Sequence, residues 1–444
     1  MEGLQALSNS IFELEQKFRD PPPGYRFSAV EISASRDKEN VEAFEAVVTT
    51  NARRLLLSQD DLCQWFTSPT AAASKDESTA ILKLCCIRRE LDVSLDISQA
   101  SFAQILSSAR AHPSVKYMIC RDYDGFHEFK GAAGFLPTSF LGNALFALVW
   151  TFDEKTLATA AVFIDRRRRM FSNFVDILCE FSSLISTSLL IGFAGCCALI
   201  HPFDRETSGW ELNTIRTVEE STGFGPHPTG YRGLEPKDLQ SYDIGQLTSW
   251  LQAVNEVAGN AGNRARHTRI CLSFLDRIRD EQLFIQNERV SCKPPTEWPH
   301  VAVADLDEAA LVLRRHISTY IDYLMYLKDR SERLSTVLFT LLTHEDAAAS
   351  IDLAAAARRD GSSMKTIAVM TMLFLPATFF AALFALPSLQ WDQETVVQAN
   401  FWIYWAFTLP TTALVFMAWM GITGRSWIKT RLRSTYRRHL KKGE

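Results

Sequence analysis

Met364, Thr371 and Thr378 recur every seven residues in one long apolar stretch near the C-terminus. Leu375 follows Thr371 by four residues, so in a helix bundle with about 3.5 residues per turn all four positions share one face. Such a face could line a water-filled path for a cation. Threonines in membrane helices also bond their own backbone carbonyls or pack between helices. We take these four residues as a candidate ion path, with packing as the alternative.

Sites for enzyme catalysis have little support in the rest of the chain. The nine histidines are scattered, without an H-E-x-x-H sequence. The glycine-rich stretch 222–233 is not G-x-G-x-x-G and contains two prolines, so it is interpreted as a loop. The four arginines at 166–169 follow a predicted strand and are interpreted as a solvated turn, with binding of phosphate or a lipid headgroup as the alternative. The sequence therefore predicts a protein that is not an enzyme and has no cofactor.

Two charge-free runs are long enough to cross a bilayer. The first, 367–386, has 20 residues, which at about 1.5 Å per residue matches a hydrocarbon core of roughly 30 Å. The second, 401–422, has Phe401, Trp402, Tyr404 and Trp405 at its start and Trp419 near its end, as expected of an aromatic belt at both interfaces. We predict transmembrane helices over 364–386 and 401–422, joined by an outer connector over 387–400.

The distribution of charge predicts how the spans are oriented. Eight arginines and lysines follow the second span, whereas the connector has no base and two acids, Asp392 and Glu394. By the positive-inside rule both termini are cytosolic, in the plasma membrane or an internal membrane. The basic tail, 423–444, sets this orientation, and contact with anionic lipid is the alternative role. A net charge of −4 gives no reason to expect nucleic acid as a partner, and the N-terminus lacks the features of a signal peptide.

Residues 1–300 are predicted to form one mixed α/β cytosolic domain. Alternating apolar residues over 91–97 indicate a strand, and 143–152 with 156–164 indicate a hairpin. Helical spacing is seen over 238–258 and 264–284, which a Gly/Asn-rich break separates.

A third charge-free run, 183–200, contains serines and glycines, and a third span would place the basic tail outside. We therefore expect a buried helix there. The nine cysteines form no C-x-x-C pair and all precede the spans, so we expect reduced thiols and no zinc site.

A long helix is predicted between this domain and the first span, over 301–363. Apolar residues in it follow one another at steps of four and three, over five heptads. This spacing is typical of a coiled-coil seam, and packing of the helix against its own domain is the alternative. The seam residues are Leu306, Ala310, Leu313, Ile317, Tyr320, Leu324, Leu327, Ser331, Leu334, Leu338 and Leu341.

Residues 340–425 resemble the fungal branch of the CorA-type divalent-cation transporters. The resemblance rests on a long helix that enters the first of two C-terminal spans, on the string MKTIAV at 364–369 with FLP at 374–376, and on FWIYW at 401–405. It implies a homopentamer with a cytosolic α/β funnel, long stalk helices and first spans around a central pore. It also implies that Leu375 and Thr378 point towards that pore.

The sequence departs from this family at the outer end of the first span. The family signature there is Tyr-Gly-Met-Asn, and the matching residues are Phe384, Ala385, Leu386 and Pro387. Pro387 has no side-chain oxygen and no backbone N–H, and Leu386 is apolar, so only carbonyls are left to contact a hydrated ion. We expect a mouth that selects magnesium poorly, towards which Asp392 and Glu394 attract cations of any kind.

Three classes of function follow from the sequence. The first is a channel or transporter for divalent cations such as Mg²⁺, and it is the one we favour. The second is a membrane-anchored scaffold or sensor that keeps the assembly without transport. An enzyme comes third, because no set of acid, base and nucleophile was found.

Overall fold

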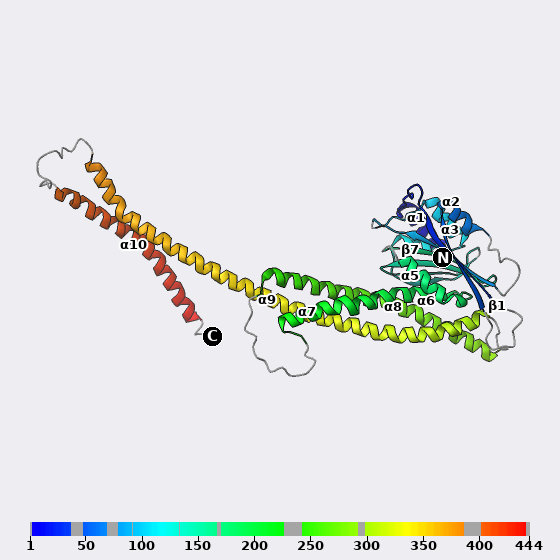
Figure 1. The fold of residues 1–444 in the computed structure, drawn as a ribbon. Helices are drawn as coiled ribbons and strands as arrows, with labels where there is room; N and C mark the ends of the chain where they lie inside the picture. Colours follow the sequence, from blue (N-terminus) through cyan, green and yellow to red (C-terminus); the bar gives the residue numbers. More distant parts are fainter. Residues whose placement is uncertain are drawn as a thin grey trace. The chain divides into compact units, whose positions relative to one another are not determined.

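The computed structural model describes residues 2–36, 48–68, 79–90, 92–132, 134–166, 170–225, 242–291, 298–385 and 401–440 (Figure 1). The chain divides into two compact units, one over Met1–Leu341 and the other over Leu342–Glu444. The boundary between the units falls inside one long helix.

The first unit is built on a seven-stranded sheet with the order β2-β1-β3-β7-β6-β5-β4. Neighbouring strands are antiparallel except β3 and β7 at the centre, which are parallel. The strands are β1 (Phe27–Arg36), β2 (Val48–Leu57), β3 (Thr79–Arg88), β4 (Gly125–Phe129), β5 (Thr138–Gly142), β6 (Phe146–Asp153) and β7 (Ala158–Asp165).

Both faces of the sheet are buried, because apolar residues occupy successive positions of the central strands and strand side chains alternate between faces. In β7, Phe163 belongs to one core and Val162 to the other. Helices α1 (Glu2–Leu14), α2 (Gln59–Thr67), α3 (Gln99–Ser108) and α4 (Val115–Cys120) cover the Val162 face. Ser58 and Ser98 begin α2 and α3 by accepting hydrogen bonds from backbone N–H groups of the first turn.

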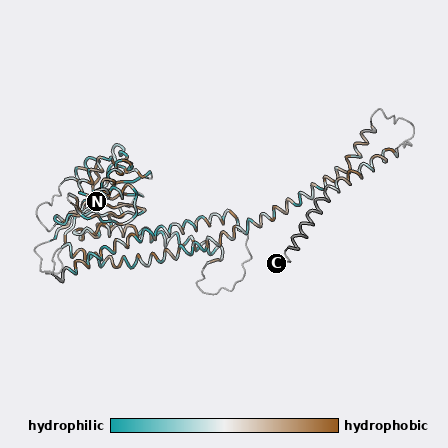
Figure 2. Tube along the Cα trace, turned by 180° about the vertical axis from the view of Figure 1, so that it is seen from behind, coloured by the Kyte–Doolittle hydropathy of each residue, from teal (hydrophilic) through white to brown (hydrophobic). Residues whose placement is uncertain are grey.

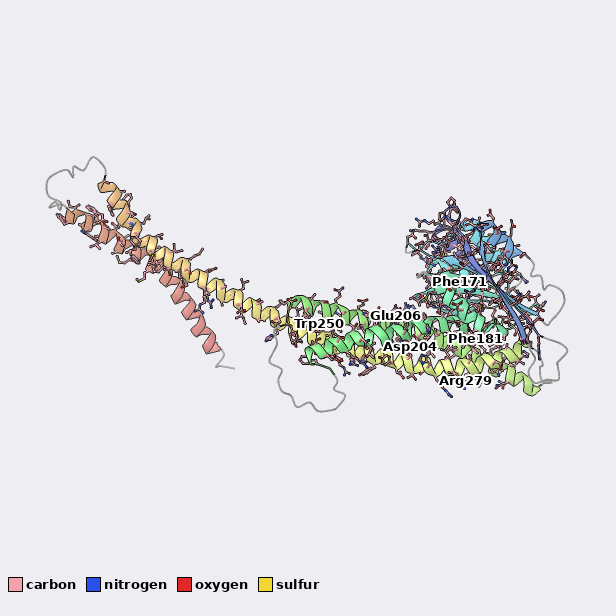
Figure 3. The ribbon with its side chains drawn as sticks, in the orientation of Figure 1. Phe171, Phe181, Asp204, Glu206, Trp250 and Arg279 are labelled. Atoms are coloured by element: carbon pink, nitrogen blue, oxygen red, sulfur yellow. The ribbon has the colours of Figure 1, made fainter. Side chains whose placement is uncertain are left out.

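Helices of the second half of the unit cover the Phe163 face. Phe171 of α5 packs edge-on against Phe163 at 5.4 Å, and Phe181 packs against Phe193 of α6 at 5.3 Å. Figure 3 labels Phe171 and Phe181. The elements of this half are α5 (Met170–Glu180), the short turn Ser182–Leu184, α6 (Leu189–Glu206), the π-helical turn Thr207–Glu211, α7 (Leu212–Thr222), α8 (Ile244–Ser291) and the first part of α9 (Trp298–Phe384). The predicted buried helix within 183–200 is confirmed over residues 189–200, which are buried in α6 apart from the half-buried Cys197.

Two expectations for this unit have opposite outcomes. The predicted hairpin is confirmed by the antiparallel pair β6 and β7, whose turn spans residues 154–157. The predicted strand over 91–97 is wrong. Val93 has a φ of 70°, which is outside the extended region, and Leu95 makes only isolated bridges to Phe18 and Arg89. Leu95 and Ile97 are buried because this turn packs under the sheet, and alternation alone did not distinguish that from a strand.

The predicted break between two helices at 259–263 is also wrong. Helix α8 passes through it without interruption from Ile244 to Ser291. A Cβ at Gly262 would make only an ordinary van der Waals contact, 3.7 Å from the Lys328 side chain of α9. A glycine in a helix costs only about 1 kcal/mol relative to alanine, so a long helix that packs on its neighbours can contain it.

The predicted long helix is observed as α9, which includes 301–363 and continues into the first apolar run. Nine of its eleven seam residues are buried inside a single chain, and Leu306, Ile317, Leu324, Leu327 and Leu338 are 0% exposed. These side chains are therefore not available to a second copy. The alternative, a long helix packed against its own domain, therefore describes this stretch. The heptad pattern could not distinguish the two, because periodicity shows which side of a helix is buried but not which partner covers it.

Contacts to α9 come from the helical layer of the same unit. Arg330 Nε donates to Glu219 Oε1 of α7 at 2.7 Å, and Arg314 pairs with Asp276 of α8 at 2.8 Å. The second unit contains the remainder of α9 and the whole of α10 (Phe401–Leu440). Each of these two helices contains a proline. The predicted second span and most of the basic tail therefore belong to one helix, and residues 441–444 lie outside the described residues.

Candidate functional site

The apolar parts of α9 and α10 pack against each other within the second unit. The rings of Phe380 and Phe407 lie 6.1 Å apart, and the Tyr404 hydroxyl donates to the Ala377 carbonyl at 3.4 Å. These contacts define an inner face of α9, the side that packs on α10. Its partly or fully buried residues are Ala368, Val369, Met372, Pro376, Ala377 and Phe380.

The candidate ion-path residues lie on another side of α9. Met364, Thr371, Leu375 and Thr378 are all exposed, and none belongs to the inner face. At 100° per residue they centre roughly 130° around the helix from the inner face. α10 therefore does not pack against their shared face, which we call the outer face, although Leu375 and Thr378 also line an open cavity beside α10.

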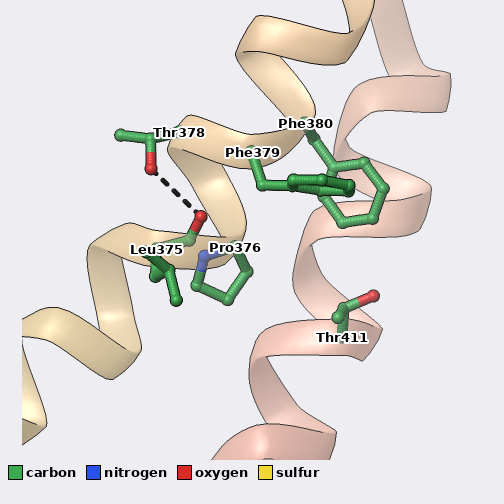
Figure 4. Close-up of a pocket in the computed structure, with 6 residues that line it drawn as sticks. All are labelled: Leu375, Pro376, Thr378, Phe379, Phe380 and Thr411. Carbon is green, nitrogen blue, oxygen red and sulfur yellow. Dashed lines mark hydrogen bonds between the residues drawn. The ribbon is translucent and has the colours of Figure 1, made fainter.

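Both threonines of the outer face bond to their own helix. Thr371 Oγ donates to the carbonyls of Ile367 and Ala368 at 3.1 and 2.9 Å, and Thr378 Oγ donates to those of Phe374 and Leu375 at 2.9 and 3.0 Å. Figure 4 shows the bond from Thr378 to the Leu375 carbonyl. Each hydroxyl proton is therefore used within its own helix, as the alternative to an ion path expects. The oxygen lone pairs remain free to accept from water around a cation.

An open cavity of about 540 Å³ lies where the two helices meet (Figure 4). Leu375, Pro376, Thr378, Phe379 and Phe380 of α9 line it together with Thr411 of α10. The lining is apolar apart from the two hydroxyls, and neither threonine is charged. A single copy of this hairpin therefore offers a cation at most weak oxygen contacts.

The outer end of the first span is described only in part. Phe384 is the last residue of α9, and the Ala385 N–H donates to the Ala381 carbonyl at 3.1 Å, so Ala385 continues the helical bonding pattern. Leu386, Pro387, Asp392 and Glu394 lie outside the described residues.

Exposed apolar side chains cover both helices of the hairpin. On α9, Ile367 and Leu375 are 63% and 69% exposed, and on α10, Trp402 and Leu414 are 66% and 63% exposed. Brown, hydrophobic segments accordingly mark the distal part of α9 and the first half of α10 in Figure 2. Large apolar side chains exposed along two helices indicate contact with a membrane or another protein. Both helices are long and apolar enough to cross a bilayer.

The strongest buried charge cluster lies instead in the first unit, around Arg264 of α8. Arg264 Nη1 donates to Glu211 Oε2 and to Thr207 Oγ, both at 2.7 Å, and Nη2 donates to Glu206 at 2.6 Å. Thr207 in turn lies 2.8 Å from the Tyr320 hydroxyl of α9. Burial raises the pKa of Glu211 despite the adjacent guanidinium, and burial raises the pKa of Tyr320 to about 12. The cluster ties α8 and α9 to the π-helical turn, near Glu206 in Figure 3.

A second charge cluster corrects the interpretation of the arginine run at 166–169. The Arg166 side chain is only 6% exposed, and its guanidinium binds Asp124 Oδ1 and Asp122 Oδ1, both at 2.8 Å. It is therefore a structural ion pair instead of a solvated residue. Residues 167–169 lie outside the described residues. Arg266 of α8 also binds Asp124, at 2.7 Å, which joins α8 to the edge of the sheet.

His267 is fully buried beside this cluster. Its Nε2 lies 3.2 Å from Arg266 Nη2, so Nε2 accepts and the proton is assigned to Nδ1, which lies 4.0 Å from Asp124 Oδ2. Burial, with the nearby arginines, lowers the pKa of His267 to about 4 in spite of the attraction of Asp124. The imidazole is therefore neutral in the folded protein at pH 7.

Acid should consequently destabilise the first unit through His267. The unfolded chain takes up a proton at this residue below about pH 6.5, whereas the folded chain does so only near pH 4. Stability is thus lost as pH falls between these values, by up to about 3 kcal/mol. Denaturant midpoints of His267→Gln at pH 7 and pH 5 should differ less than those of the native protein. His201→Gln, at an exposed site on α6, should leave the native difference unchanged, and an equal pH effect in all three proteins would exclude His267 as the cause.

Sequence reasoning did not anticipate these clusters or the cavity-lining Thr411. Arg264 and Glu211 are 53 positions apart, and no local pattern pairs them. Among the described residues, no group of three or more His, Cys, Asp or Glu side chains could hold a metal ion. The eight described cysteines are free, and Cys292 lies outside the described residues.

No protein-family model matches the chain. The notoamide biosynthesis cluster protein M′ of Aspergillus versicolor is 35% identical over 69 residues. That match spans 15% of this chain and 15% of the length of the relative.

Two solved structures match most of the length of this chain with low TM-scores. The full-length CmaX protein is 11% identical, with a TM-score of 0.37, over 93% of this chain and 99% of that chain. The CorA magnesium transporter from Methanocaldococcus jannaschii is 8% identical, with a TM-score of 0.34, over 89% of this chain and 98% of that chain.

Proposed function

We propose that this chain is an integral membrane protein that associates with copies of itself and carries divalent cations across the bilayer. The observation that carries the proposal is the uncovered outer face of α9. Four residues chosen from a heptad spacing lie together on it, and α10 packs on a different side. If several copies were arranged with this face inward, they would enclose a path lined by Thr371, Leu375 and Thr378. The resemblance to the CorA-type transporters implies five copies, a homopentamer.

Three further observations support the proposal. The two helices of the second unit expose large apolar side chains along their length, which is costly in water and favourable in lipid. The strings at 364–369, 374–376 and 401–405 resemble the CorA-type transporters. The threonine hydroxyls of the outer face present oxygen lone pairs, and oxygen is the ligand that Mg²⁺ and Ca²⁺ prefer.

The orientation that we propose places both termini in the cytosol. It rests on the eight bases after the second span and on their absence from the connector. In a cysteine-free background, a cysteine at Ser388 should react with an impermeant thiol reagent added to sealed cells, and one at Ser434 should not. Labelling at Ser434 alone would reverse the proposed orientation.

We propose a carried ion of the Mg²⁺ class without strong discrimination among divalent cations. Magnesium releases its waters reluctantly, so a selective mouth needs oxygens placed for a hydrated ion. At the signature positions Phe384, Ala385, Leu386 and Pro387, no side chain provides one. The two connector acids add only a screened attraction with a reach of about 10 Å.

The role of Thr378 provides a specific test of the ion path. Thr378→Val keeps the shape of the side chain but removes the oxygen from the outer face. We expect initial rates of magnesium entry into liposomes to fall about tenfold, comparable to the loss of one well-placed polar contact in the path.

Thr412→Val is the matched control, because the Thr412 hydroxyl donates to the Thr408 carbonyl of α10 at 2.7 Å and lies away from the outer face of α9. Its entry rate should equal that of the native protein. Equal rates for Thr378→Val and Thr412→Val would remove Thr378 from the path, and a scaffold without transport would show no protein-dependent entry in any variant.

A further inference from the structure

Thr408 of α10 differs from the other threonines in the hairpin. It is 5% exposed, and among the described residues its hydroxyl has no hydrogen-bond partner. Thr371, Thr378, Thr411 and Thr412 each donate to a carbonyl one turn earlier in their own helix. A buried hydroxyl without a partner is unfavourable, and more so in hydrocarbon, where no water can replace the missing bond. Thr408 does not use the carbonyl one turn earlier in its own helix, so its hydroxyl is free to donate to an acceptor on the neighbouring helix.

Pro376 creates such an acceptor on α9. Proline has no backbone N–H, so the carbonyl of Met372, four residues earlier, loses its helical donor. Met372 and Pro376 both lie on the inner face of α9, and Pro376 is buried there. Membrane helices tolerate proline because a neighbouring helix or a Ser/Thr side chain satisfies the freed carbonyl.

The contacts of α10 bring Thr408 to the level of Pro376. Tyr404, one turn before Thr408, reaches the Ala377 carbonyl. Thr411, almost one turn after Thr408, lines the same cavity as Pro376, and Figure 4 shows these two residues on facing helices. Residues 404, 408 and 411 share one side of a helix, so Thr408 lies on the side of α10 that packs against the inner face.

We infer that in the bilayer the Thr408 hydroxyl, which has no partner in the described part of the chain, turns to donate a hydrogen bond to the Met372 carbonyl and joins the two helices at Pro376. One donor without a partner and one acceptor without a donor are satisfied together. Thr408 is a positioning residue in this account: it fixes which side of α9 is covered by α10 and so leaves the outer face free. The inference depends on the packing of the hairpin and not on whether the protein transports ions.

A double-mutant cycle between positions 408 and 376 tests the bond directly. Unfolding of the full chain in mixed micelles would be followed by tryptophan fluorescence as sodium dodecyl sulfate is titrated. Thr408→Val should raise the unfolding equilibrium constant about threefold to tenfold, the range of hydrogen bonds between membrane helices. Thr408→Ser, which keeps the hydroxyl, should restore the native value.

Pro376→Ala returns an N–H to α9, which can then bond the Met372 carbonyl within the helix. In that background Thr408→Val should change the equilibrium constant by less than about twofold, because the partner is already satisfied. Pro376→Leu restores the same N–H and replaces Pro376→Ala if the alanine variant does not fold.

Thr412→Val is the control for loss of a hydroxyl, and its effect should be the same with either residue at 376. The inference is overturned if Thr408→Val has an equal effect in both backgrounds, or none in the native one. In either case the Thr408 hydroxyl does not donate a hydrogen bond to the Met372 carbonyl, which Pro376 leaves without its helical donor.

Discussion

Replacing Arg264 by Met should destabilise the first unit by about 3–5 kcal/mol, the cost of removing one partner of a buried ion pair. Glu211 is 0% exposed and would lose the guanidinium that binds it, so its buried carboxyl group would be left unpaired or would have to take up a proton. Glu206 is more than half exposed on its side chain and can return to water. The loss would be measured as a lower denaturant midpoint of the full chain, followed by circular dichroism.

Two variants make this result specific to the Arg264 cluster. Arg205→Met removes an exposed arginine of α6 and should change stability by no more than about 0.5 kcal/mol. Arg264→Lys keeps the charge but not the planar fork that reaches both Glu206 and Glu211, so an intermediate loss is expected. If Arg264→Met and Arg205→Met unfold at the same denaturant concentration, the cluster does not stabilise the fold.

The second large effect is expected at Leu324 of α9. Its side chain is 0% exposed inside one chain, so Leu324→Asp buries a carboxyl group among apolar side chains. The cost should be several kcal/mol and should reduce the yield of folded protein in any state of assembly. The measurement is the fraction of monodisperse protein recovered from detergent, with the helical signal of that fraction.

Val312→Asp is the matched control, because this residue lies on the same helix and is 66% exposed. It should be recovered as the native protein is. A Leu324→Asp protein that keeps native stability but dissociates into single copies would restore the earlier interpretation of the seam as a contact between copies.

Strong periodic patterns in the sequence predicted the helices and strands well, but they did not predict which part of the molecule covers each buried face. The apolar runs, the helix from about residue 301 into the first span, the buried helix at 183–200 and the hairpin of β6 and β7 all follow from hydrophobic spacing. The heptad pattern of α9 correctly indicated a buried side. It did not identify the partner, because a helix packed on its own domain and a coiled coil between copies need the same spacing.

Errors arose where tertiary contacts outweighed local preference. The glycine at 262 suggests a break by composition, but it lies in a continuous helix beside Lys328. Arg166 resembles a solvated charge, but two distant aspartates hold it in the interior. In the candidate site, the outer face of α9 followed from spacing, whereas the bond that we infer at Thr408 depends on the register of two helices, which no local pattern records.

Entry of Mg²⁺ into sealed liposomes that carry the purified native protein tests the central claim most directly. With a magnesium-sensitive dye inside, we expect entry faster than into protein-free liposomes. We also expect competition by other divalent cations, since the residues at 384–387 offer no side-chain oxygen to select magnesium. Magnesium entry no faster than into protein-free liposomes, at both signs of the membrane potential, would contradict the proposed transport function.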